Sequence, residues 1–203
     1  MLQLLAATSN KHKIQEFQDM FRDQPESLRI LSPDDVGGLP ELIENGATFE
    51  ENSAMKAEQA SRYADISAFA DDSGLVVEAL NGEPGIYSAR YAETNEGRIA
   101  KLLKNMEGVT NRKAMFVCVI SLAYRGHLVA QFRGEVHGVI AQEARGNAGF
   151  GYDPIFIPDG YDKTFGELGS DVKDTISHRA RAFAQAADFV RAELATMDDF
   201  EFI

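Results

Sequence analysis

The stretch KAMFVCVISLAYRGHLVAQFRGEVHGVIA, residues 113–141, decides the fold. Lys113 to Tyr124 is apolar and rich in β-branched and aromatic residues, which predicts a long strand. Arg125-Gly126 predicts a hairpin turn, His127 to Phe132 predicts the returning strand, and Gly134 to Ala141 extends the meander. The middle of the chain is therefore expected to form a β-meander.

The N-terminal part of the chain shows strand-then-helix patterning instead. Leu2 to Ala7 predicts a short buried strand, and Ile14, Phe17 and Phe21 recur at helical spacing after it. Leu28 to Leu31 predicts another strand. Because βα units and a meander occur in one chain, we expect an α/β fold with a mixed sheet.

A second helix is predicted to begin at Thr48, because residues 48–51, Thr-Phe-Glu-Glu, fit a capping box. It follows a loop over residues 33–46 that is rich in Gly and Pro. Apolar or small residues form one stripe of this helix: Phe49, Ser53, Ala57, Ala60 and Ala64. The neighbouring stripe is polar and consists of Asn52, Lys56, Gln59 and Tyr63.

The remaining elements are strands over 66–70 and 75–80, helices over 98–106 and 177–196, and a glycine-rich loop over 146–151. No linker or repeat interrupts the pattern. Residues 1–203 are therefore expected to form a single domain with two lobes.

The charge of the chain narrows the class of ligand. Asp and Glu number 32 against 20 Lys and Arg, which gives a formal net charge of −12. This field repels a nucleic-acid backbone, so no nucleic-acid polymer is expected as a partner. A small anion is still compatible, because a few local cations and a bound divalent metal override the global field inside a cleft.

Apolar segments and cysteine usage indicate a cytoplasmic protein with no membrane partner. No stretch approaches the ~20 apolar residues of a membrane span. The first residues, MLQLLAATSNKHK, are apolar and then basic, the reverse of a secretory signal peptide. The single cysteine, Cys118, lies in an apolar run and is expected in the core, and the four His lack zinc-ligand spacing.

The first candidate for anion binding is Thr8-Ser9-Asn10-Lys11-His12-Lys13. A strand ends and a helix begins there, so free backbone N–H groups, hydroxyls and lysines gather at one point. The alternative is simple N-capping by Ser9 or Asn10 with the lysines in solvent. The GxxxxGK spacing of a Walker A loop is absent.

The second candidate is Asp71-Asp72-Ser73-Gly74, between two predicted strands, with Glu44 and Glu51 upstream as possible partners. Adjacent carboxylates suit a hard divalent cation, or a general base acting on water beside it. The alternative is a turn, since Asp-Ser-Gly is ordinary turn chemistry. Strand alternation predicts that the side chains of Asp71 and Asp72 point to opposite sides, so that only one is essential.

The third candidate is the stretch GNAGFGYDP, residues 146–154. Its glycines allow the backbone to approach a flat ligand closely, and Phe150 and Tyr152 offer stacking surface. An ordinary glycine loop is the alternative reading.

Cations gather farther along the chain, where the last helix begins. Lys173 precedes His178 and Arg179, and positive charge at a helix start is unfavourable for the helix dipole. An anionic or carbonyl-rich ligand accounts for this placement, whereas a solvated first turn is the alternative.

Taken in order, these motifs resemble the dITP/XTP pyrophosphatase family, the inosine triphosphatase-like enzymes. The matching motifs are residues 8–13, residues 46–53 with Lys56, and residues 70–75, 84–90, 149–154 and 176–179. Each motif is weak alone, but their succession over nearly the whole chain is specific.

The resemblance implies a two-lobed α/β fold with a long mixed sheet flanked by helices, an active-site cleft between the lobes, and a homodimer. It also implies Mg²⁺-dependent hydrolysis of deaminated purine nucleoside triphosphates. ITP, dITP and XTP would yield the monophosphate and pyrophosphate, which removes these nucleotides from the pool.

The resemblance further implies residue roles. Asp72 binds metal and serves as proton acceptor, Glu44 is a second metal ligand, and Ser73 touches the substrate. The expected phosphate contacts are Thr8, Ser9, Asn10, Lys11, His12, Lys13 and Lys56. The residues expected around the base are Phe150, Gly151, Tyr152, Asp153, Lys173, His178 and Arg179.

Some assignments stay open at this level. Glu41, Glu50 and Glu51 compete with Glu44, and Ser9 stands where the family often has glycine. Asp171-Val172 precedes Lys173, where the family often has acidic residues in both places. Two other functions are also compatible: a pyrophosphatase for other modified nucleotides, such as modified pyrimidines, and a nucleotide-sensing dimer without turnover.

Overall fold

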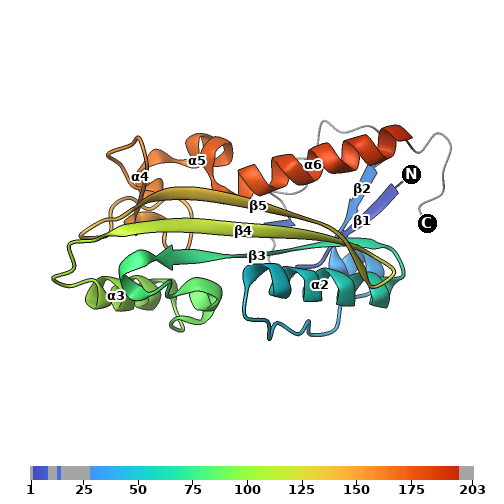
Figure 1. Cartoon of the computed structure of the whole chain (residues 1–203), viewed down its shortest axis with the longest axis horizontal. Helices are drawn as coiled ribbons and strands as arrows, with labels where there is room; N and C mark the ends of the chain where they lie inside the picture. The colour runs from blue at the N-terminus through green and yellow to red at the C-terminus, as the bar shows by residue number, and fades with distance from the viewer. Residues whose placement is uncertain (1, 9–12, 15–27, 197–203) are drawn as a thin grey trace. The chain divides into compact units, whose positions relative to one another are not determined.

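A computed structural model describes residues 2–8, 13–14 and 28–196 of the chain. Its strands are β1 (Leu2–Ala6), β2 (Leu28–Leu31), β3 (Ser67–Val77), β4 (Lys113–Tyr124), β5 (His127–Ile140) and β6 (Phe156–Pro158). Its helices are α2 (Phe49–Ala64), α3 (Asn95–Asn105), α4 (Phe165–Leu168), α5 (Ser170–Ile176) and α6 (His178–Thr196), shown in Figure 1.

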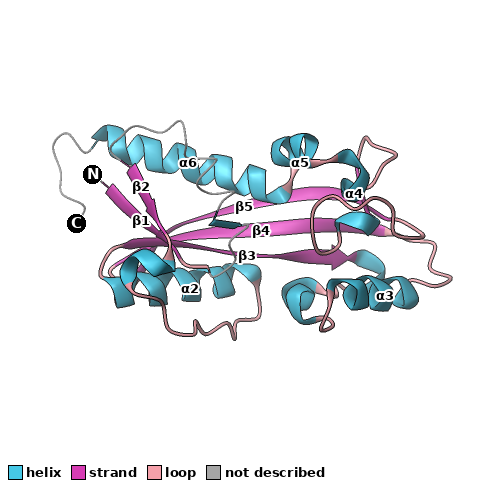
Figure 2. Cartoon of the chain, turned by 180° about the vertical axis from the view of Figure 1, so that it is seen from behind, coloured by secondary structure: helices cyan, strands magenta, loops and turns pink. Residues whose placement is uncertain are grey.

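The six strands form one sheet with the hydrogen-bonded order β2-β1-β3-β4-β5-β6. β1 runs parallel to both β2 and β3, with Leu4 opposite Ile30 and Ser67. β6 runs antiparallel to β5, with Ile157 opposite Val139. The sheet is therefore mixed, and Figure 2 separates its strands from the helices that flank it. The predicted α/β class is confirmed.

The chain divides into two compact units. The first unit comprises residues 1–72, 119–132 and 182–203, and the second comprises residues 73–118 and 133–181. β3, β4 and β5 each contribute residues to both units. The cleft expected between two lobes stays a prediction.

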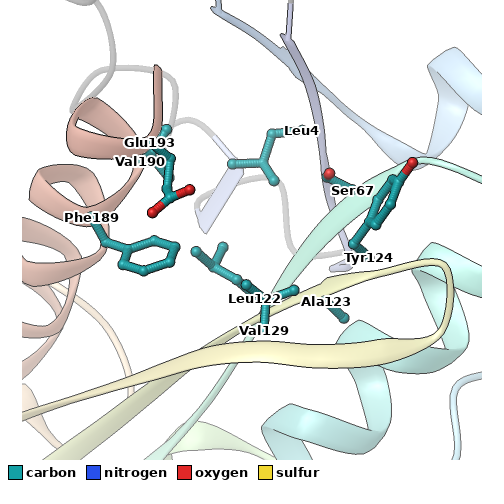
Figure 3. A pocket seen from close by; sticks show the side chains of 9 residues that line it. All are labelled: Leu4, Ser67, Leu122, Ala123, Tyr124, Val129, Phe189, Val190 and Glu193. Carbon is teal, nitrogen blue, oxygen red and sulfur yellow. The ribbon is translucent and has the colours of Figure 1, made fainter. Parts of the chain in front are cut away.

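In the first unit, helices cover both faces of the sheet: α2 lies on one face and α6 on the other (Figure 1). Because side chains alternate along a strand, neighbouring residues of β1 meet different helices. Leu5 belongs to the apolar cluster that includes Ala57 and Ala60 of α2. Leu4 instead lies toward α6 (Figure 3). The predicted small-residue stripe of α2 therefore packs against the sheet.

A small apolar hollow remains on the α6 side of the first unit (Figure 3). Leu4 and Leu122 line it from the sheet, and Phe189, Val190 and Glu193 line it from α6. Its volume is about 30 Å³. This is far below the roughly 300–1,000 Å³ of small-molecule sites, so the hollow is too small for a nucleotide.

The core of the second unit brings α3 and α4 together with the strands. Leu102 and Met106 are buried beside Leu75 and Val77 in one apolar cluster. Phe116 belongs to the same cluster. Its ring centroid lies 4.6 Å from that of Phe156 and 6.4 Å from that of Phe165. Tyr152 and Ile155 also belong to this core, which therefore anchors the chain directly after the glycine-rich loop.

β3 contradicts the predicted pair of separate strands. Residues 67–77 form one continuous strand, so the break predicted at Asp71-Asp72-Ser73-Gly74 is wrong, and the turn considered there as the alternative does not form. The sequence signal for a turn depends on carboxylates that bond their own backbone. Here Asp71 bonds Lys13 and Asp72 bonds Asn52 instead. After Val77 the chain forms a 3-10 helix, Glu78–Leu80, rather than strand.

The meander is largely as predicted. β4 has the expected bounds, and Arg125 and Gly126 have φ values of 51° and 78°. Two successive positive φ values are typical of a type I′ hairpin turn. The break predicted between Phe132 and Gly134 is wrong, because β5 continues from His127 to Ile140.

The start of α2 confirms Thr48 as its N-cap. Thr48 Oγ1 accepts a hydrogen bond from Glu51 N at 3.1 Å. The Glu51 carboxylate, however, accepts from Ala47 N at 2.6 Å, one residue before the group that a capping box uses.

Other differences concern short elements. The predicted loop over residues 33–46 contains a 3-10 helix, Pro33–Val36. β6, α4 and α5 are too short to give a periodic signal and were not expected. Of the predicted first helix, Lys13 and Ile14 are helical, whereas Phe17 and Phe21 lie outside the described residues.

Two simpler expectations concern Cys118 and the membrane. Cys118 is completely buried in β4, as predicted. Over the parts of the chain that the structure describes, no helix combines the length and the apolar character needed to cross a bilayer.

Candidate active site

The first unit contains a cluster of carboxylates around one ammonium group. Lys56, on α2, is 8% exposed, and its Nζ donates to the carbonyl oxygen of Asp71 at 2.6 Å. The same Nζ lies 3.4 Å from Glu44 Oε1 and 3.5 Å from Asp72 Oδ1. Lys56 therefore brings together the two carboxylates predicted to bind metal.

Asp72 is held on its other oxygen by an amide. Asn52 Nδ2 donates to Asp72 Oδ2 at 3.2 Å, and both side chains are buried. Burial raises the pKa of the Asp72 carboxyl above its ordinary value of 3.8, although Lys56 and the Asn52 hydrogen bond act in the opposite direction. Glu44 and Asp71 add to the rise through like-charge repulsion. A further cation beside Asp72 would stabilise the ionised form of this carboxyl.

Asp71 has a different partner, as strand alternation predicted. Its Oδ2 accepts a hydrogen bond from Lys13 Nζ at 2.7 Å, and the Asp71 side chain is 1% exposed. The two neighbouring carboxylates thus have separate tasks: Asp71 holds Lys13, and Asp72 faces Lys56 and Asn52.

A hollow of about 400 Å³ lies beside this cluster, within the range of small-molecule sites. Its polar lining comes from Thr8, Lys13, Glu41, Glu44, Lys56 and Asp71. Three of the candidate phosphate contacts, Thr8, Lys13 and Lys56, and the candidate metal ligand Glu44 therefore share one cavity.

The same geometry distinguishes Glu44 from its competitors. Glu44 forms an ion pair with Lys56, whereas the Glu51 carboxylate accepts a hydrogen bond from Ala47 N. Glu41 also lines the hollow. Among the described residues, however, its carboxylate forms no ion pair with Lys56 and no hydrogen bond with Asp72. Glu44 is the best-placed second ligand.

The second unit contains a separate cluster around Phe150. The Phe150 side chain is 41% exposed, and Lys173 Nζ lies 4.3 Å from its ring centroid. The Arg179 guanidinium carbon lies 5.4 Å from the same centroid. Two cations placed against one exposed aromatic ring suit a flat ligand that carries oxygen acceptors.

The buried carboxylate of Asp153 holds this cluster together through hydrogen bonds. Its Oδ2 accepts from Lys173 Nζ at 2.5 Å and from Phe150 N at 2.8 Å. Asp153 is 2% exposed, so its carboxylate is used within the protein to position Lys173 and the Phe150 loop.

Ser73 also belongs to this cluster, and His178, the residue before Arg179, contacts the core of the second unit. Arg179 Nη2 points to Ser73 Oγ at 3.5 Å, longer than a usual hydrogen bond. The buried His178 ring stacks on Phe116, with centroids 4.8 Å apart and an interplanar angle of 13°. This stacking fixes the ring plane of His178 at the start of α6.

Tyr152 differs from its expected role as a stacking surface. It is 5% exposed and belongs to the apolar core of the second unit. Its hydroxyl, whose pKa is raised by burial, donates to the carbonyl oxygen of Ser88 at 3.0 Å. Phe150 is therefore the aromatic surface of this loop, and Tyr152 anchors the loop to residues 84–90.

The predicted residues thus fall into two groups. Thr8, Lys13, Glu44, Lys56 and Asp72 meet in the first unit, and Ser73, Phe150, Asp153, Lys173 and Arg179 meet in the second, where His178 stacks on Phe116. Gly151 lies in the Phe150 loop with a φ of 62°. Ser9, Asn10, Lys11 and His12 lie outside the described residues.

Sequence reasoning missed Asn52 as a site residue. The signal that could have found it is the polar stripe of α2, since Asn52 and Lys56 are one helical turn apart. Both are buried, which is unusual for polar residues without a specific task.

The donor set at Asp72 and Glu44 fits Mg²⁺. Among the described residues, no group of three or more His, Cys, Asp or Glu side chains is arranged to hold a metal ion. Mg²⁺ nevertheless needs only one or two carboxylates when substrate phosphates and water complete its octahedron. The carboxylates of Glu44 and Asp72, close to Lys56 beside the hollow of about 400 Å³, would meet that requirement.

A mixed α/β sheet that carries buried carboxylates and lysines beside one hollow defines an enzyme class that acts on small anionic substrates. The chain belongs to the Ham1 family, which it matches over residues 4–189.

Similar proteins agree with this assignment. The chain is 44% identical to a dITP/XTP pyrophosphatase of Desulfotalea psychrophila over 185 residues, which covers 90% of this chain and 82% of that protein. It is 44% identical to a protein of the same name from Staphylococcus epidermidis over 202 residues, which covers 95% and 98% of the two chains. The solved structure of a HAM1 protein from Coxiella burnetii matches with a TM-score of 0.88 and 36% identity, covering 95% of this chain and all of that one.

Proposed function

We propose that this protein hydrolyses dITP, XTP and ITP to the nucleoside monophosphate and pyrophosphate in the presence of Mg²⁺. The observation that carries the proposal is the pair of carboxylates, Glu44 and Asp72, held within 3.5 Å of one buried lysine beside a hollow. The relatives named dITP/XTP pyrophosphatase support the choice of substrate.

The first unit supplies what phosphoanhydride cleavage requires. A triphosphate needs its negative charge neutralised, and Lys13 and Lys56 are the cations that line the hollow. The Asp71 carboxylate holds Lys13 in place and so fixes one of these charges. Thr8 adds a hydroxyl donor for a phosphate oxygen.

Mg²⁺, when bound by Glu44 and Asp72, would supply further charge neutralisation on the phosphate oxygens. Asn52 donates to Oδ2 of Asp72, and the other oxygen, Oδ1, faces Lys56. A water molecule beside Asp72 would lose its proton to this carboxylate while the water oxygen bonds to phosphorus. The bond to the bridging oxygen breaks, and pyrophosphate leaves with the electron pair.

The second unit supplies base recognition. The exposed ring of Phe150 offers a stacking surface, and Lys173 and Arg179 lie against the same ring. Hypoxanthine, xanthine and guanine all present O6 as an acceptor, whereas adenine presents an amine there. A donor that faces O6 therefore rejects ATP without rejecting GTP.

Selection against GTP requires a group that faces C2 of the base. Xanthine carries oxygen at C2 and guanine carries an amine, so a donor or cation there favours xanthine and opposes guanine. Arg179 and Lys173 both lie against the Phe150 ring and carry only donors, so they are the two candidates. Opposed donors in a dry site cost ~1–3 kcal/mol, or roughly 10- to 100-fold discrimination.

Arg179→Ala is therefore expected to lower the ratio of kcat/KM for XTP to that for GTP by roughly 10-fold or more. Steady-state kinetics on both nucleotides measures this ratio, with Lys173→Ala as the matched variant. An equal proportional loss on XTP and GTP would show that Arg179 serves general positioning rather than base reading.

A substrate panel tests the proposed function as a whole. The protein is incubated with ITP, dITP, XTP, GTP, dTTP and ATP under Mg²⁺, and rates are compared. We expect fast turnover of the first three and slow turnover of the others. Preference for dTTP would indicate a pyrophosphatase for other nucleotides, and binding of dITP without turnover would indicate a nucleotide sensor.

A further inference from the structure

The segment that carries Glu44 is held by side chains of α2 rather than by burial. This segment, residues 43–47, is called here the Glu44 segment. None of residues 40–48 is buried, and the Ile43 side chain is 59% exposed. Leu42, directly before the segment, packs against the apolar core of the first unit, but no residue of the segment itself belongs to that cluster.

Side chains of α2 form hydrogen bonds with the backbone at both ends of the segment. Gln59 Oε1 accepts from Ile43 N at 3.0 Å, and Gln59 Nε2 donates to the carbonyl oxygen of Ile43 at 3.0 Å. Gln59 Nε2 also donates to the carbonyl oxygen of Met55 at 2.8 Å, which fixes the amide itself. Ile43 is thus bound to α2 through both of its backbone polar groups.

Asn52 binds the other end of the segment and reaches Asp72 as well. Asn52 Oδ1 accepts from Gly46 N at 2.9 Å, while Nδ2 donates to Asp72 Oδ2 at 3.2 Å. Because Gly46 N can only donate, the amide must turn its oxygen to Gly46 and its NH₂ group to Asp72. One buried side chain therefore connects the Glu44 segment to the proton acceptor.

Gly46 shows how closely the segment approaches the helix. A Cβ atom at this position would lie 2.6 Å from Glu51 Cβ and 3.0 Å from Asn52 Oδ1. Any side chain there would push the segment away from α2.

We propose that Asn52 and Gln59 are positioning residues that hold Glu44 beside Asp72, so that the two carboxylates bind one divalent cation together. This proposal rests on the metal-binding role given to Glu44 and Asp72 above. Gln59 contacts only the segment and its own helix among the interactions described, so its effect on the metal passes through the backbone of Ile43.

The test measures Mg²⁺ affinity of the whole, nucleotide-free protein by isothermal titration calorimetry. Gln59→Ala is expected to weaken Mg²⁺ binding by about 10-fold, as is typical when a residue that orients a metal ligand is removed. The Gln59 bonds lie at the exposed surface, so the variant should fold. Gly46→Ala leaves Asn52 and Gln59 in place but displaces the segment, and the same loss is expected.

Ser53→Ala is the matched control on the same helix. Ser53 is buried and bonds Ser121 Oγ at 2.7 Å, with no bond to the Glu44 segment among those of the described residues. This variant should lower thermal stability without changing Mg²⁺ affinity.

Kinetics give a second readout. For Gln59→Ala, the Mg²⁺ concentration for half-maximal rate should rise by about the same factor, whereas kcat at saturating Mg²⁺ should return to the wild-type value. Unchanged Mg²⁺ affinity in both Gln59→Ala and Gly46→Ala overturns the proposal. An equal loss in Ser53→Ala, or no Mg²⁺ binding by the wild type, overturns it too. Turnover of dITP by the wild type tests the proposed function separately.

Discussion

Asp72→Asn is expected to lower kcat by about 10²–10⁴-fold and to leave the fold intact. The amide has nearly the shape of the carboxylate, but it cannot take a proton from water and carries no charge for the metal. Burial raises the pKa of Asp72, so its ionised form destabilises the metal-free protein once the pH exceeds the ordinary carboxyl pKa. At neutral pH the variant should therefore unfold at the same temperature as the wild type or higher.

Asp71→Asn is the matched control for this prediction. Asp71 is the neighbouring carboxylate, but it holds Lys13 rather than facing Lys56. Its substitution should raise KM through Lys13 and retain measurable turnover. Near-native kcat in Asp72→Asn, or a greater loss in Asp71→Asn, would contradict the roles assigned to the two residues.

Asp153→Ala is expected to destabilise the protein by about 3–5 kcal/mol, because it leaves a buried ammonium without its counter-ion. Asp153 and Lys173 are 2% and 8% exposed, and the carboxylate also accepts from Phe150 N. Urea denaturation measures the loss. Activity should fall as well, since the Phe150 loop loses its internal anchor.

The double variant Asp153→Ala with Lys173→Met separates charge from packing. Removing both partners eliminates the stranded ammonium, so the double variant should be more stable than Asp153→Ala alone. A loss below about 1 kcal/mol in the single variant would place this pair among weak surface ion pairs, contrary to its burial.

Much of the fold could be predicted because strong periodicity and turn chemistry agree there. The bounds of β4, the Arg125-Gly126 turn and the Thr48 cap follow from patterns within a few residues. β3 could not be predicted in this way. Its central Asp-Asp-Ser-Gly sequence favours a turn locally, and only partners far along the chain, Lys13 and Asn52, make a continuous strand possible.

The candidate site likewise contains some residues that could be predicted from the sequence and others that could not. Residue types and motif order selected Asp72, Lys56 and Arg179 as candidates, because their chemistry is visible in the sequence. Tyr152 was expected at the ligand surface, but whether an aromatic residue faces a ligand or the core depends on tertiary packing. Asn52 and Gln59 were visible as part of a polar stripe, yet their contacts with residues 43–47 and Asp72 required the structure.

Product identification with dITP tests the central claim most directly. The wild-type protein, dITP and Mg²⁺ are followed by ³¹P NMR in ¹⁸O-enriched water. The account predicts dIMP and pyrophosphate as products in equal amounts. Formation of dIDP and inorganic phosphate, or no turnover at all, would contradict it, whereas the product that carries ¹⁸O identifies the phosphorus attacked by water.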